Sequence, residues 1–320
     1  MKCLVLGGGG FIGINLCKAL LMQGYEVCIF DRTKPEFHSE LLSKIEWITG
    51  DFLIESDIEC AMQDCDVIFH LISTTIPKTS NENPIYDVES NLVGTLKILR
   101  CANRCGVSKV IFASSGGTVY GIPEDSPIKE SHPTNPTCSY GIIKLAIEKY
   151  LHLFYVEHGL DYCVLRISNP YGIGQRMQSE QGVVSVIVGR ILTGKPVEIW
   201  GDGKVIRDYI HIEDVIQAFI KSITYTGKNK IFNIGSGEGT DLNKIISVIE
   251  DAFDRTINVS YLAARGLDVP VNILDNTLAR KELGWSITRE FSQGIHETVR
   301  SHVERYKKSI IFECINTRIH

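Results

Sequence analysis

A stretch near the N-terminus decides the fold: Cys3-Leu4-Val5-Leu6-Gly7-Gly8-Gly9-Gly10-Phe11-Ile12-Gly13. Its four leading apolar residues predict a buried strand, and a helix-like stretch begins directly after the glycines. Glycine allows positive φ angles and lets the backbone approach a pyrophosphate, whose charge then lies at the N-terminus of the following helix. This strand–loop–helix context predicts a dinucleotide-binding site at Gly7, Gly10 and Gly13.

A carboxylate at the end of the second predicted strand indicates which dinucleotide binds. Asp31 lies 18 residues beyond Gly13. There it would hydrogen-bond a ribose hydroxyl and repel a 2′-phosphate, which favours NAD over NADP. Arg32 argues for NADP instead, because an arginine can bind that phosphate. Asp51 follows another predicted strand and could either meet the adenine or stabilise a turn.

Short apolar runs alternate with helix-like stretches through the first half of the chain. The runs are 3–6, 27–30, 67–71, 109–112 and 162–167, and helical spacing is clear in 14–22 and 91–102. This alternation predicts an α/β fold with a Rossmann-type, doubly wound parallel sheet. After about residue 171 the pattern loosens, which indicates a smaller, interleaved C-terminal substrate domain. We expect an NAD-binding domain over 1–172, with segments near 205–240 returning to it, and a smaller lobe mainly over 173–320 that includes a surface helix at 292–308.

The composition is that of an ordinary globular protein that acts on small molecules. The 320 residues carry a net charge of −5 without a block of like charges, which argues against nucleic-acid and membrane partners. No apolar run approaches the roughly 20 residues of a membrane span, and no signal segment precedes the first strand. The ten cysteines form no CxxC pair, so we expect free thiols in a reducing cytoplasm and no metal site.

The stretch Tyr140-Gly141-Ile142-Ile143-Lys144 places a phenol and an ammonium about one helical turn apart. A tyrosine with its ordinary pKa of about 10 is a poor base at neutral pH. A lysine and a positively charged nicotinamide nearby would favour the phenolate and lower that pKa. The YxxxK spacing is common by chance, but after a dinucleotide loop and a serine-rich strand end it predicts a proton-transfer pair.

Further motifs follow in order along the chain. They are Phe69-His70-Leu71, Asn91 with Gly94-Thr95, Val119-Tyr120-Gly121, Leu165-Arg166 with Asn169-Pro170, Arg207-Asp208-Tyr209, Asn233-Ile234-Gly235 and Leu283-Gly284-Trp285. Together with the glycine loop, Asp31 and YxxxK, they resemble the extended short-chain dehydrogenase/reductase family over residues 1 to about 300. Within that family the chain is similar to the nucleotide-sugar 4-epimerases of the UDP-galactose 4-epimerase type.

The resemblance implies a reaction and a tightly held cofactor. In such enzymes the 4-hydroxyl of a UDP-sugar is oxidised by hydride transfer to NAD, and the 4-keto sugar takes the hydride back on its other face. Tyr140 would be the base, and Lys144 would tune it and bind the nicotinamide ribose. Substrates of the UDP-glucose or UDP-GlcNAc type, as used in polysaccharide biosynthesis, are expected. The implied cofactor contacts also include Phe11, Ile12, Arg32, Phe52, Leu71 and Asn91.

The resemblance further implies a set of substrate contacts. Asn169 and Arg207 would bind the diphosphate, and Arg265 with Asp268 the diphosphate and the uridine ribose. Counting forward from Asp268 places Asn272 beside the C2 substituent, where a bulky aromatic residue would exclude N-acetyl groups. The small asparagine predicts that UDP-GlcNAc and UDP-GalNAc are accepted alongside, or in preference to, UDP-glucose and UDP-galactose. The alternative is that Met177 or Tyr171 closes the pocket.

The serine-rich strand end departs from the family pattern. The family places a Ser or Thr four residues before the tyrosine of Val119-Tyr120-Gly121, where this chain has Gly116. Thr118 is our first candidate for the hydroxyl that meets the reacting sugar oxygen, and Ser115 is the second. Family dehydratases and decarboxylases carry a catalytic Glu at the Thr118 position, so the threonine argues against those reactions.

Two other functions stay open at this point. A nucleotide-sugar reductase or dehydrogenase on the same fold would need a cofactor that exchanges. A non-catalytic dinucleotide sensor would commonly lack Tyr140 or Lys144, and both are present. The resemblance also implies a homodimer, in which helices near 91–105 and 142–154 would pair with those of a second copy.

Overall fold

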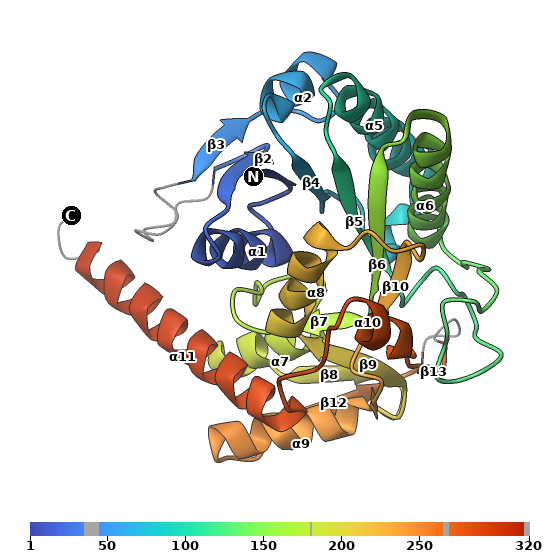
Figure 1. The fold of residues 1–320 in the computed structure, drawn as a ribbon. Coiled ribbons are helices and arrows are strands. Elements are labelled where there is room, and N and C mark those ends of the chain that lie inside the picture. Colours follow the sequence, from blue (N-terminus) through green and yellow to red (C-terminus); the bar gives the residue numbers. More distant parts are fainter. Residues whose placement is uncertain (35–44, 180, 265–268, 317–320) are drawn as a thin grey trace.

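A parallel sheet forms the centre of the molecule (Figure 1). The structure is a computed structural model that describes residues 1–34, 45–179, 181–264 and 269–316. In these ranges the sheet has seven strands in the order β10-β6-β5-β4-β1-β2-β3, all paired in parallel. Their bounds are β1 (Lys2–Leu6), β2 (Glu26–Asp31), β3 (Glu46–Thr49), β4 (Val67–His70), β5 (Lys109–Ser115), β6 (Asp161–Ile167) and β10 (Ile231–Ile234). The predicted Rossmann-type fold is confirmed.

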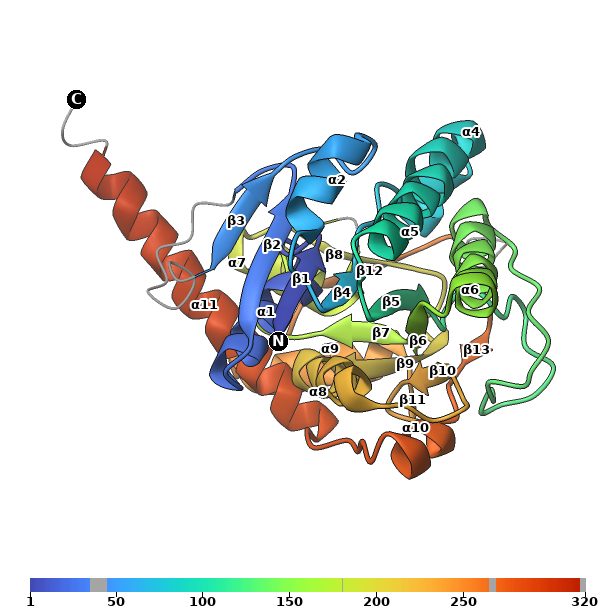
Figure 2. The same cartoon turned by 45° about the horizontal axis from the view of Figure 1, so that its top comes forward.

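Helices cover both faces of this sheet (Figures 1 and 2). Successive strand residues point to opposite faces, so an apolar run such as β1 supplies two cores. Val5 packs with α1 (Phe11–Met22) and α8 (Ile212–Thr224). Leu4 packs on the other face, and the helices there are α2 (Glu55–Met62), α5 (Gly94–Arg104) and α6 (Ser139–His158).

The later part of the chain forms a second group of elements below the sheet in Figure 1. Within the described ranges, β9 (Ile206–His211) is the centre of a small sheet and pairs with β7 (Asn169–Tyr171), β11 (Gly239–Thr240) and β13 (Val271–Asn272). β8 (Val197–Trp200) pairs with β12 (Val259–Leu262). The helices here are α7 (Val183–Leu192), α9 (Leu242–Phe253), α10 (Thr277–Glu282) and α11 (Phe291–Asn316).

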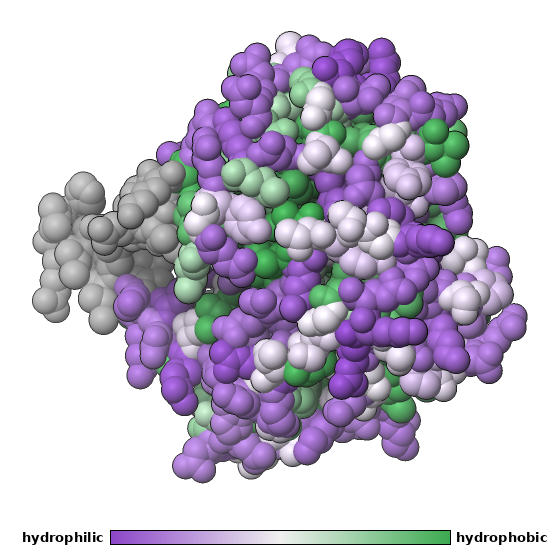
Figure 3. Space-filling model, in the orientation of Figure 1, coloured by the Kyte–Doolittle hydropathy of each residue, from purple (hydrophilic) through white to green (hydrophobic). Residues whose placement is uncertain are grey.

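The helix α11 extends away from the body toward the C-terminus (Figures 1 and 2). It is longer than the predicted helix at 292–308, because it runs to Asn316. No helix in the described ranges combines the length and apolar character that crossing a membrane requires. The face drawn in Figure 3 is largely hydrophilic.

The strand order indicates at which edge of the sheet a ligand would bind. β1 lies between β4 and β2, so the chain order reverses there. In open α/β sheets, ligands bind outside the carboxyl ends of the strands at such a reversal. The glycine loop follows β1 at this edge, and Ser115 is the last residue of β5 at the same edge.

Candidate active site

The glycine loop forms a tight turn that needs its glycines. Gly7 has a φ of +82°, and its N–H donates to the carbonyl of Phe30 (2.9 Å) while its own carbonyl accepts from Gly10 (3.1 Å). A Cβ added at Gly13 would lie 2.5 Å from the Gly7 carbonyl oxygen. The backbone amides at the start of α1 therefore border an open loop, where a pyrophosphate can bind.

A cavity of about 190 Å³ opens beside this loop. The Asp31 carboxylate at its edge accepts hydrogen bonds from the backbone N–H groups of Gly9 (3.0 Å) and Arg32 (2.7 Å). These contacts hold the carboxylate against the glycine loop, where a ribose hydroxyl of a dinucleotide would meet it. Six predicted cofactor residues line the cavity, namely Gly7, Gly10, Asp31, Arg32, Phe52 and Leu71.

Other predicted cofactor residues lie around the loop or hold the backbone. Phe11, Ile12 and Gly13 form the first turn of α1. The Asp51 carboxylate accepts a hydrogen bond from the N–H of Leu53 (2.9 Å). That contact stabilises a turn, which is one of the two roles that the sequence left open for Asp51.

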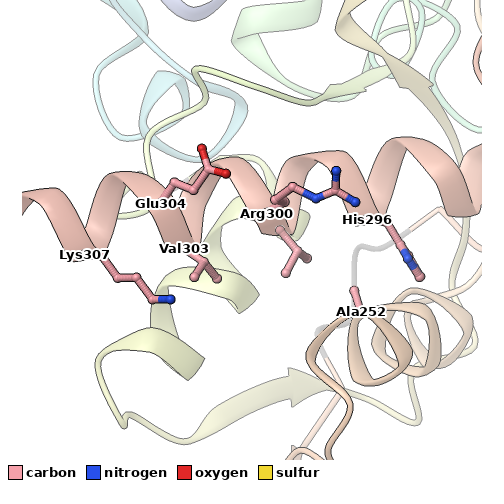
Figure 4. A pocket seen from close by; sticks show the side chains of 7 residues that line it. Ala252, His296, Arg300, Val303, Glu304 and Lys307 are labelled. Carbon is pink, nitrogen blue, oxygen red and sulfur yellow. The ribbon is translucent and has the colours of Figure 1, made fainter.

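A second cavity, of about 340 Å³, lies between α9 and α11. Figure 4 shows the residues that line it, which are Ala252 of α9 and side chains of α11 that include Arg300, Glu304 and Lys307. None of the predicted site residues lines it. The cavity beside the glycine loop is therefore the candidate cofactor site.

Tyr140 and Lys144 lie together on α6. The Lys144 ammonium is buried, donates to the carbonyl of Ala113 (2.9 Å) and lies 5.4 Å from the centre of the Tyr140 ring. Burial lowers the pKa of Lys144 to about 8, although the carboxylates of Asp87 and Glu148 act in the opposite direction.

The pKa of Tyr140 differs from the expectation. Burial raises it above its ordinary value, and nearby Cys138 and Asp87 act in the same direction. The lysine therefore does not make Tyr140 a better base in the protein alone. A lower pKa requires a positive charge that ligand binding brings.

The N-terminus of α6 is held by side chains that sequence reasoning missed. Ser80 accepts a hydrogen bond from the backbone N–H of Tyr140 (3.0 Å), 60 residues away, and Asn81 accepts one from Ser139 (2.8 Å). The Asp87 carboxylate accepts from the Ser139 hydroxyl (2.6 Å). These contacts fix the start of the helix and hence the backbone of Tyr140. No local sequence signal connects them.

Asn91 belongs to this cluster as well. Its side-chain amide donates to the buried Asp87 carboxylate (2.8 Å), and its oxygen accepts from the N–H of Thr74 (2.9 Å). The same carboxylate accepts from the hydroxyl of Thr75 (2.6 Å). Asn91 thus connects the segment after β4 to the start of α6, while its predicted contact with the cofactor stays a prediction.

The turn after β5 explains why position 116 is glycine. A Cβ added at Gly116 would lie 2.4 Å from Leu274 Cδ1, so a hydroxyl side chain does not fit there without repacking. The Thr118 hydroxyl is buried and, among the described residues, has no hydrogen-bond partner. A Cβ at Gly141 would lie 2.9 Å from the Thr118 carbonyl, so this turn packs on the first turn of α6. Thr118 therefore lies on a turn next to the start of α6, and its hydroxyl has no partner in the described structure.

The small sheet around β9 gathers three predicted substrate residues. Asn272 of β13 lies opposite Arg207 of β9 in register, and Asn169 of β7 lies opposite Tyr209 of β9. The Arg207 guanidinium donates to the carbonyl of Val269 (2.6 Å). The predicted Arg265 and Asp268 lie outside the described residues.

Asn272 is almost completely buried, with 2% of its surface exposed. Its amide nitrogen lies 3.4 Å from the carbonyl oxygen of Gly116, which is a long hydrogen bond. Its amide oxygen is buried and has no partner within the described ranges. Asn272 thus reaches the turn that carries Thr118.

In the described part of the chain, no group of three or more His, Cys, Asp or Glu side chains is placed to hold a metal ion. The nine cysteines whose side chains are described are free, and most of them are buried.

Residues 3–235 match the family described as NAD dependent epimerase/dehydratase. The chain belongs to this family. NAD is its cofactor, as Asp31 predicted, and the glycine loop with its neighbouring cavity fits a dinucleotide.

Two relatives show how far the similarity extends. UDP-glucose 4-epimerase of Mycolicibacterium smegmatis is 34% identical over 306 residues, which cover 93% of this chain and 97% of that protein. dTDP-4-dehydro-6-deoxyglucose reductase of Escherichia coli is 34% identical over 305 residues, which cover 93% of this chain and 96% of that protein.

Solved structures share the fold along nearly the whole chain. UDP-glucose 4-epimerase of Thermotoga maritima, solved with UDP-glucose, has a TM-score of 0.90 at 33% identity and covers 95% of this chain and 99% of its own. The Thermus thermophilus UDP-glucose 4-epimerase complex with NAD has a TM-score of 0.87 at 31% identity and covers 94% and 98%. UDP-N-acetylglucosamine 4-epimerase of Methanobrevibacter ruminantium, in complex with UDP-N-acetylmuramic acid, has a TM-score of 0.88 at 28% identity and covers 95% and 98%. The predicted resemblance to nucleotide-sugar 4-epimerases is confirmed.

Proposed function

We propose that the protein interconverts the 4-epimers of a UDP-hexose or UDP-N-acetylhexosamine through a transient 4-keto sugar. The observation that carries this proposal is the grouping of Tyr140, Lys144 and the free Thr118 hydroxyl at the carboxyl edge of the sheet that holds the NAD cavity. The relatives named UDP-glucose 4-epimerase support the same reaction.

Each side chain has a separate task in this proposal. Bound NAD supplies the acceptor and donor of the hydride. The Tyr140 phenolate oxygen takes the proton of the sugar 4-hydroxyl and later returns it. The Lys144 ammonium lies at the face of the tyrosine ring, and together with the positive nicotinamide of bound NAD it would favour the charged phenolate. Thr118, or Ser115 in its place, donates a hydrogen bond to the reacting sugar oxygen.

The nucleotide end of the substrate would lie over the small sheet. Asn169 and Arg207 would bind the diphosphate, with Arg265 and Asp268 completing the contacts to the diphosphate and the uridine ribose. The guanidinium of Arg207 suits this task, because it can donate several hydrogen bonds to phosphate oxygens.

Asn272 supports acceptance of an N-acetyl group at C2. A buried, unpaired amide group costs about 1–3 kcal/mol, and the Asn272 oxygen is such a group in the described structure. The N–H of a C2 acetamido substituent would donate a hydrogen bond to this oxygen. A C2 hydroxyl is shorter and would reach less far toward it. We therefore propose that UDP-GlcNAc and UDP-GalNAc are accepted alongside, or in preference to, UDP-glucose and UDP-galactose. A relative of similar fold is named UDP-N-acetylglucosamine 4-epimerase.

A reductase is the second candidate function, and one observation favours it. The Escherichia coli relative named dTDP-4-dehydro-6-deoxyglucose reductase is as similar in sequence as the epimerase from Mycolicibacterium smegmatis. Net reduction consumes one reduced cofactor in each turnover, so the cofactor has to exchange. An epimerase regenerates its cofactor and can keep it bound.

The homodimer is also part of this proposal, and exposed apolar side chains support it. The exposed side chains on one side are Ile85 of α4 (Pro84–Asp87) and Val88 and Val93 of the π-helix η2 (Val88–Val93). On α6 they are Ile142 and Val156. Ile85 is 72% exposed and Val156 is 66% exposed. α4, η2 and α5 run on from one another along the chain and lie beside α6 (Figure 2). A second copy would cover this face. A monomer in light scattering at micromolar concentration would contradict it.

We also propose that the protein works in the cytoplasm. The buried free thiols suit a reducing compartment.

One incubation tests the proposed reaction. The purified protein is mixed with UDP-glucose or UDP-GlcNAc without added cofactor, and the product sugars are separated. The 4-epimer of at least one substrate should form with the protein-bound NAD as the only cofactor. A folded, NAD-loaded protein that converts neither sugar contradicts the proposal, and turnover that depends on added reduced cofactor favours the reductase.

A further inference from the structure

A fully buried ion pair lies next to the reaction edge of the site, by which we mean Tyr140, Lys144 and the turn that carries Thr118. Arg166, near the end of β6, makes two parallel hydrogen bonds to Glu148 of α6, from Nε to Oε1 (3.0 Å) and from Nη2 to Oε2 (2.6 Å). The two side chains are 3% and 0% exposed. Glu148 follows Lys144 by four residues, which is about one helical turn. The pair therefore joins the catalytic helix to the central sheet.

The same pair reaches both ends of the turn that carries Thr118. The hydroxyl of Ser114, before the turn, donates to Glu148 Oε1 (2.6 Å). The guanidinium of Arg166 donates from Nη1 to the hydroxyl of Tyr120, after the turn (2.9 Å). That hydroxyl in turn donates to the side-chain oxygen of Asn233 in β10 (2.6 Å). One connected network thus holds α6, the two ends of the turn and three strands.

Stability alone gives little reason for such a pair. Removing two charges from water is costly, and apolar residues of similar size are often equally stable in the same place. A bidentate guanidinium–carboxylate contact, however, fixes both distance and angle between the two elements that it joins. Reaction rates depend on such geometry, because a misplacement of about 1 Å can cost about a hundredfold.

We propose that Glu148 and Arg166 are positioning residues of the reaction. They hold Tyr140 and Lys144 at a fixed distance from the Ser115–Thr118 turn, so that the base and the hydroxyl meet the same sugar oxygen. This inference rests on the proposed function. It gives a common purpose to Arg166, Tyr120 and Asn233, three residues to which the sequence analysis assigned no role.

The chain contains a matched control at the opposite ends of the same two strands. Lys109 begins β5 and Asp161 begins β6, and their side chains form a largely buried ion pair (3.2 Å). The Lys109 ammonium also donates to carbonyl oxygens at the end of α8, including those of Ser222 and Ile223. This pair lies at the amino ends of the strands, away from the predicted site.

The test compares Glu148→Met/Arg166→Met with Lys109→Met/Asp161→Asn. For each protein we would measure Tm, bound NAD, and kcat and KM with a UDP-sugar that the wild type converts. The first variant should retain NAD and a KM close to that of the wild type, while kcat falls at least about tenfold. The control should keep its kcat even where its Tm falls further. A folded, NAD-loaded first variant with the wild-type kcat, or an equal loss of kcat in both variants, overturns the inference.

Milder variants keep the inference testable if the double variant does not fold. Ser114→Ala and Tyr120→Phe each remove one hydroxyl from the network and should lower kcat by a smaller factor, again without raising KM. Wild-type kcat in both contradicts the positioning role. A wild type that converts no UDP-sugar contradicts the proposed function itself, so the two failures are distinguishable.

Discussion

The site has two edges that are assembled in different ways. The nucleotide edge consists of the glycine loop and Asp31, and the reaction edge consists of Tyr140, Lys144 and the turn that carries Thr118. The first is one continuous strand–loop–helix unit, in which Gly7 and Gly13 shape the loop and Asp31 hydrogen-bonds back to Gly9. The second places Tyr140 beside the turn that carries Thr118, because the distant Ser80 side chain holds the backbone of Tyr140 and the turn packs on Gly141. Backbone geometry thus defines the cofactor site, whereas tertiary packing defines the proposed sugar site. Changes at the two edges should therefore have separable effects.

The largest effect is expected at the reaction edge. Tyr140→Phe removes one oxygen and leaves the glycine loop intact, so bound NAD and Tm should stay near the wild-type values. Turnover should fall at least about a hundredfold, the low end of general-base contributions. Tyr155→Phe, on the exposed side of the same helix, is the control and should be fully active. Near-normal turnover in Tyr140→Phe would remove this residue from its role.

The nucleotide edge should respond in affinity and cofactor preference. Asp31→Ala removes a charged hydrogen-bond acceptor worth about 1.5–3 kcal/mol and the repulsion of a 2′-phosphate. NAD binding should weaken about tenfold or more and the preference over NADP should narrow, as measured by cofactor titration of protein freed of NAD. Asp51→Ala, whose carboxylate holds a turn, is the comparison and should leave the preference unchanged. A wild type that already prefers NADP would show that Arg32 governs instead.

Asn272→Tyr tests which sugar fits. The larger ring should fill the space beside the turn and selectively reduce kcat/KM for UDP-GlcNAc and UDP-GalNAc, by about tenfold relative to UDP-glucose and UDP-galactose. Asn272→Ala separates space from hydrogen bonding, because it removes the amide without filling the space. It should weaken the N-acetyl pair only modestly. Equal activity of the tyrosine variant on both pairs would place the pocket wall elsewhere, for example at Met177 or Tyr171.

The smallest effect is expected for the hydroxyl that would take the place of the family's Ser or Thr at position 116. Thr118→Val keeps the shape of the side chain and removes one neutral hydrogen bond, worth about 0.5–1.5 kcal/mol. We expect a severalfold fall in kcat with little change in KM. Ser115→Ala should change kcat less than Thr118→Val. The reverse order would assign the role to Ser115.

The same contrast explains what the sequence could predict. The glycine spacing and Asp31 predicted the fold and NAD, because their function depends on backbone conformation within about 30 residues. The reason for Gly116 was not readable, because Leu274 fills its side-chain space from far along the chain. The raised pKa of Tyr140 was not readable either, since burial and the carboxylate of Asp87 cause it. Ser80 and Asn81 likewise act only after folding brings them to α6.

The central claim is that one hydrogen leaves C4 of the sugar and returns to it within the same active site. A UDP-sugar that carries deuterium at C4 tests this claim in ordinary water, with the NAD-loaded protein and no added cofactor. Because a hydride does not exchange with solvent, the 4-epimer isolated by chromatography should retain the deuterium at C4 in full, as read by mass spectrometry and NMR. An epimer that has lost this deuterium to solvent would contradict the account.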